Sequence, residues 1–476
     1  MQWLELLEDR LDSQAEQVQT YEAYYAGHHP LQFATYKFRQ AFGNLFQAFA
    51  DNWCEIVIDA PVERLTVVGF RTGDATATDD AAWAIWQENA LDVASVIAHT
   101  EAGKCGRCYL MVDPTGDDGP QITVESAAQV IVACDPADRR NRLAALKKWT
   151  GDDGALYANV YLPDGVYKWT AEAQQSSSTE IVLPSGVNSG AGDNEWEPLG
   201  GDVPYSLGRV PVVPLENKPS LMKGGQSDLN PAIPVQNAIN KLCTDMLVAS
   251  EYGAFPQRVV TGIEVPRDPE TGQLWPDVQL QAAMSRHWFF ENPDARTHEF
   301  SSADLGNYVK AIDVLIQHLA AQTRTPPHYL LGQVVNVSGD ALAAAEAGLV
   351  AKCKAKQLFF SDAWEEAMAL ALSASGGEVK AADCEALWAN PERSTPTEEA
   401  AAAVQRQTLG VPEEQLWLEL GYTPAQIEEW KKAKEAEPPP PPPPSIVGPN
   451  GQPLTPQDGG PDGPGVVRDP GQPGAA

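Results

Sequence analysis

The sequence contains one pair of cysteines at a spacing that redox and zinc sites use, Cys105 and Cys108. A zinc site needs two further ligands at matched spacing, and neither a second such pair nor closely spaced histidines follow. A redox pair is expected at the start of a helix, where the helix dipole lowers the pKa of the thiol. Here the pair leads into the strand-like residues 109–112. We interpret both cysteines as structural, with a metal or redox role as the alternative.

The other residues that could do chemistry lie in turns. Asp117-Asp118 and Asp152-Asp153 are flanked by glycine, which is typical of solvated turns rather than of acid–base pairs. The sequence has no phosphate-binding GxxxxGK[ST] loop, no GxGxxG, no HExxH and no GxSxG, and its seven histidines show no ligand spacing. We therefore predict no catalytic residue, no metal ion and no cofactor, and we do not expect an enzyme.

The net charge of −32 over 476 residues limits the partners of the protein. Tight binding to DNA phosphates is normally driven by lysine and arginine, because they release condensed counterions. An acidic chain of this kind therefore either avoids nucleic acid or touches it loosely. The seven cysteines are an odd number at irregular spacing, which does not indicate a disulfide framework. No apolar run reaches the roughly 18 residues that a membrane span needs, so no membrane contact is expected.

The N-terminal half alternates between helical and strand-like patterns. Helical spacing of apolar residues covers 1–50 and 80–102, whereas strand-like runs divided by turn residues cover 54–71 and 105–215. Residues 174–202 are rich in serine, glycine and asparagine, which indicates a loop. The chain is too long for one compact core, so we predict an α+β protein of several structural units.

Two helices with apolar stripes are predicted on either side of a short α/β insert. The first covers 226–252, with Asp228 or Asn230 placed to cap it. The insert covers 255–300, and the second helix covers about 302–324. The apolar stripe of the second helix consists of Leu305, Val309, Ile312, Ile316 and Leu319. Its opposite side carries Lys310, Gln317 and Arg324.

A much longer helix is predicted after Pro326 and Pro327, which end the preceding one. It opens near Ser338 and runs to about residue 375, which is on the order of 55 Å at about 1.5 Å per residue. Its apolar seam contains Leu342, Leu349, Cys353, Phe360, Trp364, Met368 and Leu372. A helix of this length is typical of large assemblies or helical bundles.

The C-terminal part divides into a folded and an unfolded portion. Three short helices are predicted at 397–409, 412–420 and 424–436. From Pro438 the sequence has seven consecutive prolines and then a Gly/Pro-rich stretch. Such a composition cannot bury enough apolar surface to fold, so we predict a disordered tail.

The order of helix, insert, helix, loop and very long helix resembles the portal (connector) proteins of tailed bacteriophages. Local segments are similar to the Gp6-like portals of long-tailed phages of actinobacteria-type hosts, in an ordered set that covers about residues 10–435. The segments are YYAG at 24–27, NWC at 52–54, VERLTVVGFR at 62–71, GKCGRCYLMV at 103–112, AALKKW at 144–149, WANPE at 388–392, GVPEEQLW at 410–417 and LGYTP at 420–424.

This resemblance implies the portal fold, an α+β architecture in which an α/β wing, a two-helix stem, a small α/β clip and a helical crown follow a fixed order. The implied boundaries are 1–225 for the wing, 226–254 for the first stem helix, 255–301 for the clip, 302–324 for the second stem helix, 325–339 for the tunnel loop, 340–375 for the long wing-to-crown helix, 376–437 for the crown and 438–476 for the tail.

The resemblance also implies a function. Portal subunits form a ring, usually of twelve, at one capsid vertex of the virion, and the ring is assembled in the host cytoplasm. They nucleate head assembly with the major capsid protein and scaffold, dock the terminase large subunit, and later hold the head–tail adaptor. Double-stranded DNA passes through the ring without sequence specificity. The motor supplies the energy, which agrees with the missing phosphate-binding loop.

Site residues follow from this map as expectations. We expect Lys310, Gln317 and Arg324 of the stem to face the channel, together with Gln333, Asn336 and Ser338 of the tunnel loop. The stripe from Leu305 to Leu319 is expected to serve stem packing, including contact with neighbouring subunits. Arg267 and Arg286 of the clip are candidates for contact with terminase or adaptor.

Three other functions fit the sequence less well. Another head–tail ring component is usually shorter and lacks the stem–clip–stem order. A hydrolase would need a catalytic constellation, which the sequence does not contain. A cellular scaffold protein would be a free monomer rather than a ring.

Overall fold

The computed structural model describes most of the chain, which mixes helices and sheets. The described residues are 1–30, 51–73, 78–116, 119–172, 194–205, 207–221, 224–254, 258–261, 271, 294, 296–299, 304–332, 339–376, 379–392, 396–420, 422 and 424–435. They divide into two compact units, Met1–Pro424 and Ala425–Ala476. No helix among the described residues combines the length and the apolar composition that crossing a membrane requires.

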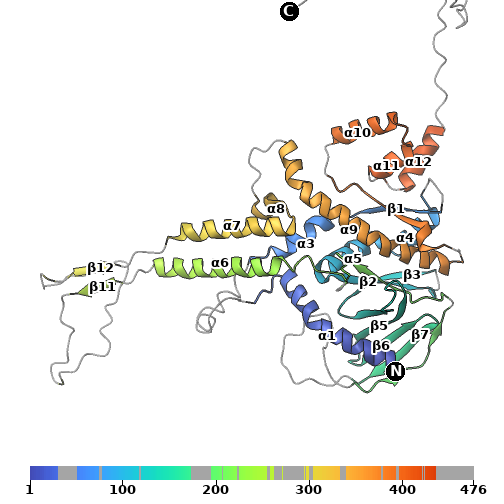
Figure 1. Ribbon diagram of the computed structural model, residues 1–476, viewed down its shortest axis with the longest axis horizontal. Helices are drawn as coiled ribbons and strands as arrows, with labels where there is room; N and C mark the ends of the chain where they lie inside the picture. Colours follow the sequence, from blue (N-terminus) through green and yellow to red (C-terminus); the bar gives the residue numbers. More distant parts are fainter. Residues whose placement is uncertain are drawn as a thin grey trace, which may run out of the picture. The chain divides into compact units, whose positions relative to one another are not determined.

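A three-stranded antiparallel sheet lies at the centre of the first unit (Figure 1). Its order is β10 (Val212–Glu216), β2 (Arg107–Asp113) and β3 (Gln121–Ser126). Helices α5 (Leu91–Cys105) and α9 (Gly339–Ala374) pack against it. Trp364 of α9 meets Trp86 of α4 (Asp80–Glu88) edge to face, with ring centroids 5.0 Å apart. Large aromatic side chains thus fill the space between the sheet and the long helix.

A second, larger sheet packs against the N-terminal helix. It contains β4 (Val130–Cys134), β5 (Arg142–Thr150), β6 (Leu156–Leu162), β7 (Gly165–Ala171) and β8 (Glu197–Pro198), and β9 (Val203–Pro204) also pairs with β7. Helix α1 (Gln2–Tyr25) buries Leu4, Leu7 and Leu11 against it. These leucines are three and four residues apart, so they lie on one face of α1 and make that face apolar. The predicted β-rich region at 105–215 is confirmed.

Two local predictions were wrong. The run Ile56-Val57-Ile58 was predicted as a strand because β-branched residues favour strands, but it lies in α3 (Cys54–Val62). The buried positions of α3 are 54, 57, 58, 60, 61 and 62, and 54, 57, 58, 61 and 62 follow the spacing of one helical face. The second error concerns part of 376–437, which was predicted to be a helical crown. The three short helices predicted there are confirmed at 396–408, 413–419 and 424–435, but the segment before them is not all helical. Strand β13 (Cys384–Trp388) lies there and pairs antiparallel with β1 (Val67–Thr72).

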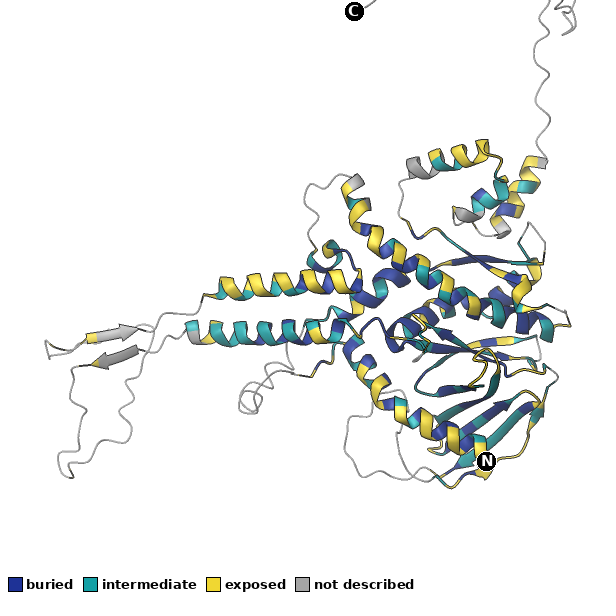
Figure 2. Ribbon diagram, viewed as in Figure 1, coloured by how far each residue is buried: buried dark blue, intermediate teal, exposed yellow. Residues whose placement is uncertain are grey.

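Helices α6 (Ala232–Ala254) and α7 (Leu305–Thr323) lie side by side and extend away from the sheets (Figure 1). Asp304 caps α7 by accepting a hydrogen bond from the backbone N–H of Gly306. Beyond them, β11 (Arg258–Thr261) and β12 (Arg296–Glu299) form an antiparallel pair. The outer surface of α7 is largely exposed, whereas most of α6 is buried or half-buried (Figure 2).

The long helix is confirmed: α9 has 36 residues. It follows the short α8 (Pro327–Leu331), and six residues of its predicted seam are buried, namely Leu349, Cys353, Phe360, Trp364, Met368 and Leu372. The C-terminal turns of α9 contact β13: Glu365 accepts a hydrogen bond from the backbone N–H of Ala386 at 3.0 Å. The remaining short elements are the 3₁₀ turn Ala381–Asp383, α10 (Pro396–Thr408), α11 (Glu413–Glu419) and α12 (Pro424–Glu435).

A buried histidine makes this core sensitive to acid. His99 is fully buried, stacks on Phe360 and accepts a hydrogen bond from Trp364 Nε1 at 3.0 Å. Burial, assisted by the charge of Lys356, lowers the pKa of His99 to about 3. The unfolded chain binds this proton near pH 6.5, so the free energy of unfolding should fall by up to about 1.4 kcal/mol per pH unit as the pH drops from about 6.5 toward 3.

Urea unfolding measured at several pH values between 6.5 and 4.5 checks this prediction. The variant His99→Gln cannot titrate, so its free energy of unfolding should depend less steeply on pH than that of the unaltered protein. Equal slopes in the two proteins would contradict the prediction, because the other titrating groups are shared.

Candidate channel stem and its buried anchor

The three residues predicted to face a channel lie along the exposed part of α7 and its end. Lys310 and Gln317 are exposed and seven residues apart, which is two helical turns. Arg324 is exposed, follows another seven residues later and caps the C-terminus of α7 with φ of +55°. The three polar side chains thus recur at equal steps along the stem. The other predicted channel and clip residues, Gln333, Asn336, Ser338, Arg267 and Arg286, lie outside the described residues.

The apolar stripe of α7 faces α6 of the same chain over part of its length. Ile316 and Leu319 are buried in one core cluster with Ile239 and Cys243 of α6, and Ile312 packs against that cluster. Leu305 is half-buried, and Val309 remains 49% exposed. Helices α6 and α7, which together form a helical hairpin, therefore pack against each other through Ile312, Ile316 and Leu319.

Helix α6 is attached to the body by buried amide side chains that the apolar pattern did not predict. Gln236 accepts from the backbone N–H of Trp53 at 2.9 Å and donates to the carbonyl of Asp51 at 2.7 Å. Asn237 accepts from the hydroxyl of Tyr24 at 2.8 Å. Asn240 Nδ2 lies 2.8 Å from His29 Nδ1. Buried amides need partners of fixed geometry, so these bonds set the position of the stem on the body.

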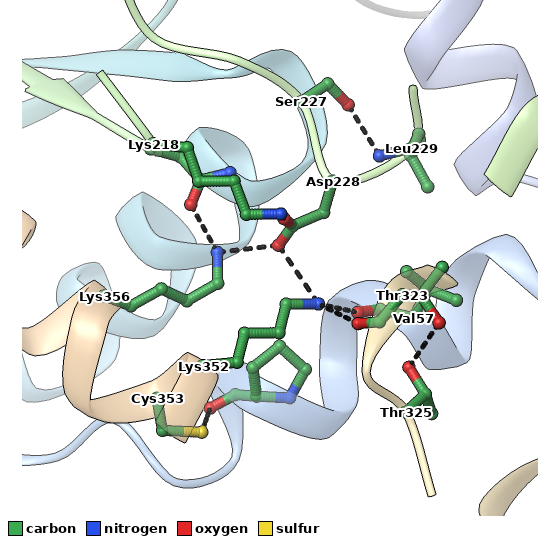
Figure 3. Close-up of polar contacts among 12 residues, drawn as sticks. Val57, Lys218, Ser227, Asp228, Leu229, Thr323, Thr325, Lys352, Cys353 and Lys356 are labelled. Carbon is green, nitrogen blue, oxygen red and sulfur yellow. Dashed lines mark hydrogen bonds and ion pairs between the residues drawn. The ribbon is translucent and has the colours of Figure 1, made fainter. Parts of the chain in front are cut away.

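The base of the stem is tied to the long helix by one buried carboxylate (Figure 3). Asp228, which lies just before α6, is 1% exposed. Its Oδ2 is 2.8 Å from Lys356 Nζ and 3.4 Å from Lys352 Nζ, both on α9, and its Oδ1 pairs with Lys218. Asp228 was predicted as a possible helix cap, but its carboxylate faces these ammonium groups. We call these four residues the Asp228 cluster.

The Asp228 cluster contains more positive than negative groups: three lysines surround one aspartate. Burial alone would raise the pKa of Asp228, but Lys356, Lys352 and Lys218 together hold it well below its usual range. Burial lowers the pKa of Lys352 to about 8, against the pull of Asp228. Three cationic side chains therefore share one anion: Lys352 and Lys356 are buried, whereas the side chain of Lys218 is 45% exposed.

Lys352 connects the Asp228 cluster to the C-terminal end of α7 and to α3. Its ammonium donates to the backbone carbonyl of Thr323, the last residue of α7, at 3.2 Å. It also donates to the carbonyl of Val57 in α3 at 3.4 Å. The beginning of α6, the end of α7 and the middle of α9 thus meet at one polar centre (Figure 3).

A second buried ion pair joins the two sides of residues 332–339. Arg64 Nη2 donates to the hydroxyl of Tyr329 in α8 at 2.9 Å and to Glu346 in α9 at 3.0 Å. Its Nη1 donates to the carbonyl of Pro391 at 3.2 Å. His328 Nε2 lies 3.5 Å from the other oxygen of Glu346. One guanidinium therefore holds the helices before and after this segment together.

The cysteine pair has the environment of buried structural thiols. Cys105 ends α5, so it lies at the negative rather than the positive end of the helix dipole. Burial raises the pKa of both Cys105 and Cys108, with a further contribution from Glu101. Within the described part, Glu22, Glu101 and Cys105 are close enough to offer ligands to one metal ion. The ammonium of Lys104 already contacts both carboxylates, at 2.6 and 2.8 Å.

Comparisons with known proteins agree with this architecture. A family model for phage portal proteins, SPP1 Gp6-like, matches residues 4–439. The portal protein of Mycobacterium phage D29 is 32% identical over 405 residues, which cover 80% of this chain and 78% of that protein. The portal protein of Mycobacterium phage L5 is 31% identical over the same shares.

Two solved structures of necks are also similar. The neck of a native GTA particle, computed with C12 symmetry, has a TM-score of 0.43 at 12% identity, over 86% of this chain and 99% of that chain. The neck of an empty GTA particle, computed with C6 symmetry, has the same TM-score and identity, over 81% of this chain and 93% of that chain.

Proposed function

Because the chain belongs to the SPP1 Gp6-like family of phage portal proteins, we propose that twelve copies form a closed ring whose channel passes double-stranded DNA. The ring occupies the portal vertex of the capsid, is assembled in the host cytoplasm, and nucleates the head with major capsid protein and scaffold. It docks the terminase large subunit during packaging and the head–tail adaptor afterwards. A single heterologous contact repeated around an axis closes such a ring.

The observation that carries the proposal is the hairpin of α6 and α7. It supplies the two stem helices, and the pair β11–β12 beyond it supplies the start and end of the clip. In this assignment 1–225 is the wing, 340–375 the wing-to-crown helix and 376–437 the crown, with β13 of the crown region paired to the wing. Residues 325–339 are assigned to the tunnel loop and 438–476 to the tail.

The charge of the protein suits a channel that must not hold its cargo. Lys310 and Arg324 give each stem two exposed cations, whereas the whole chain carries a net charge of −32. A few phosphate contacts in an acidic ring would guide DNA without binding it tightly. Gln317 and the tunnel-loop residues Gln333, Asn336 and Ser338 add polar, uncharged contacts.

The energy for DNA movement comes from elsewhere in this proposal. The sequence lacks a phosphate-binding loop, so the ring acts as a passive conduit and not as an ATPase. Arg267 and Arg286 of the clip are the proposed contacts with terminase or adaptor.

The size of the purified particle tests ring formation. We expect a closed ring with a central hole in negative-stain electron microscopy and a mass of about twelve times the 51.3 kDa chain by mass photometry. A chain that stays monomeric even with capsid protein and scaffold present would contradict the ring and favour a cellular scaffold protein. A ring that docks only to tail components would favour another head–tail ring component.

Charge reversal in the stem tests the channel. The double variant Lys310→Glu and Arg324→Glu should still form rings but should package several-fold less DNA, because it replaces phosphate-attracting charges by repelling ones. Packaged DNA is measured as nuclease-resistant DNA in assembled heads. The control is Lys354→Glu, which reverses an exposed charge on α9. An equal loss in the control, or no loss in the double variant, would contradict a channel role for these residues.

A further inference from the structure

Three groups that can react with one another lie in contact inside the first unit. Lys356 Nζ is 2.6 Å from the side-chain carbonyl oxygen of Asn217. The same atom is 2.8 Å from the carboxylate of Asp228 (Figure 3). Lys356 and Asp228 are each 1% exposed, and Asn217 is fully buried. An amine, a primary amide and a carboxylate are thus packed together without access to bulk water.

We propose that Lys356 and Asn217 become joined by an intramolecular isopeptide bond, with Asp228 as the group that carries the protons. This modification is a single event within one chain and turns over no substrate. It does not depend on ring formation, so its test is independent of the proposed function.

The chemistry balances without an oxidant or a co-reactant. The carboxylate of Asp228 takes a proton from the ammonium of Lys356, and the freed lone pair attacks Cγ of Asn217, forming the new C–N bond. The second proton lost by Nζ and the proton held on Asp228 pass to Nδ2. The old C–N bond then breaks, Nδ2 leaves with both protons as ammonium, and Asp228 ends as the carboxylate it was.

The electrostatics of the Asp228 cluster favour this reaction. An amine is nucleophilic only when neutral, and like charges close together favour the loss of a proton from one of them. Two further lysines, Lys218 and Lys352, share the same carboxylate. Because the product amide is uncharged, the bond removes one of the surplus buried cations.

The surrounding structure holds the amide in place. Asn217 Nδ2 donates to the carbonyl of Gln226 at 2.7 Å, and the backbone N–H of Asn217 donates to the carbonyl of Gly106 at 2.9 Å. On the other side, Lys356 Nζ lies 5.5 Å from the centre of the Phe360 ring. Fixed, dehydrated reactants of this kind react as if at very high concentration, and the lack of water suppresses hydrolysis of the amide.

The bond would connect the end of β10 to the middle of α9. These residues are 139 positions apart in the sequence, so the bond closes a large covalent loop. A loop of this size restricts the unfolded chain, in the way that a long-range disulfide does. It would do so without cysteine chemistry, and it would survive reducing conditions.

Intact-mass spectrometry of the purified full-length protein tests the proposal. We expect a mass lower than that of the sequence by one ammonia molecule, either at once or after incubation at mildly alkaline pH. Proteolysis should then release a branched peptide that joins the segments around Asn217 and Lys356. A mass that stays equal to that of the sequence would overturn the proposal. So would an ammonia loss that maps to a linear peptide, because succinimide formation at Asn217 produces the same mass change.

Two variants make the assignment specific. Lys356→Arg keeps the positive charge but lacks a nucleophilic amine, so its mass should equal that of its sequence. Lys354→Arg makes the same exchange at an exposed position of α9 and should retain the branched peptide. A branched peptide that persists in Lys356→Arg, or disappears in Lys354→Arg, would contradict the assignment. If Lys356→Arg does not fold, the mass and peptide map of the unaltered protein decide alone.

Discussion

Replacing Asp228 by asparagine should lower the free energy of unfolding by about 3–5 kcal/mol, the usual cost of leaving buried charges without their partner. The side chain keeps its shape, so the loss does not reflect a cavity; it combines the missing charge with the missing isopeptide bond, whose formation needs the Asp228 carboxylate. Lys352 and Lys356 would remain buried, at 3% and 1% exposure, without an anion. Urea unfolding at neutral pH, followed by tryptophan fluorescence, measures the difference.

A second substitution separates charge from other effects of this variant. Lys352→Met in the Asp228→Asn background removes one uncompensated cation, so it should recover part of the lost stability. Lys352 takes no part in the proposed isopeptide bond, so recovery reports on charge alone. A loss below about 1 kcal/mol in the single variant would show that the Asp228 cluster is not an important anchor.

The second large effect should follow from Arg64→Met. This change leaves Glu346 in a site where its side chain is only 11% exposed, with the imidazole of His328 3.5 Å away. We expect a loss of about 3 kcal/mol. We also expect faster amide hydrogen exchange in α8 and in the first turns of α9, because Arg64 joins these helices.

Arg71→Met is the matched control for this experiment. Arg71 pairs with Glu385 at 2.7 Å, but the side chain of Glu385 is 62% exposed. Exposed pairs contribute roughly 0–1 kcal/mol, so the control should lose little stability and should leave exchange in α8 unchanged. Similar losses in both variants would mean that burial does not distinguish the two pairs.

Patterns within single elements predicted much of this fold. The buried seam of α9 from Leu349 to Leu372 was identified by helical spacing alone. One face of this helix is buried at every turn, so apolar side chains recur with the period of the helix. The alternation of short strands and turns identified the β-rich region in the same way. Residues 56–58 were misassigned because a three-residue β-branched run satisfies both patterns, and only the buried partners of α3 decide between them.

The polar anchors could not be predicted from spacing. Asp228 and Lys356 lie far apart in the sequence, and a lone aspartate before a helix resembles an ordinary cap. Gln236, Asn237 and Asn240 were not singled out, because their partners lie far away in the sequence, at Tyr24 of α1 and at positions 29, 51 and 53. A useful signal was present in hindsight: Lys352 and Lys356 stand on the same side of α9 as the apolar Leu349 and Phe360, where charged residues are rarely placed without a partner.

The Asp228 cluster fixes α9, near the middle of the helix, to the start of α6 and the end of α7. The helix is held at Lys352 and Lys356, about 22 Å from its first residue and about 30 Å from its last, at 1.5 Å per residue. A helix that is fixed in this way cannot shift along its own axis relative to α6 and α7. In Asp228→Asn this connection between α9 and the pair α6–α7 would be lost, so the two halves of α9 would no longer be held to that pair at their junction.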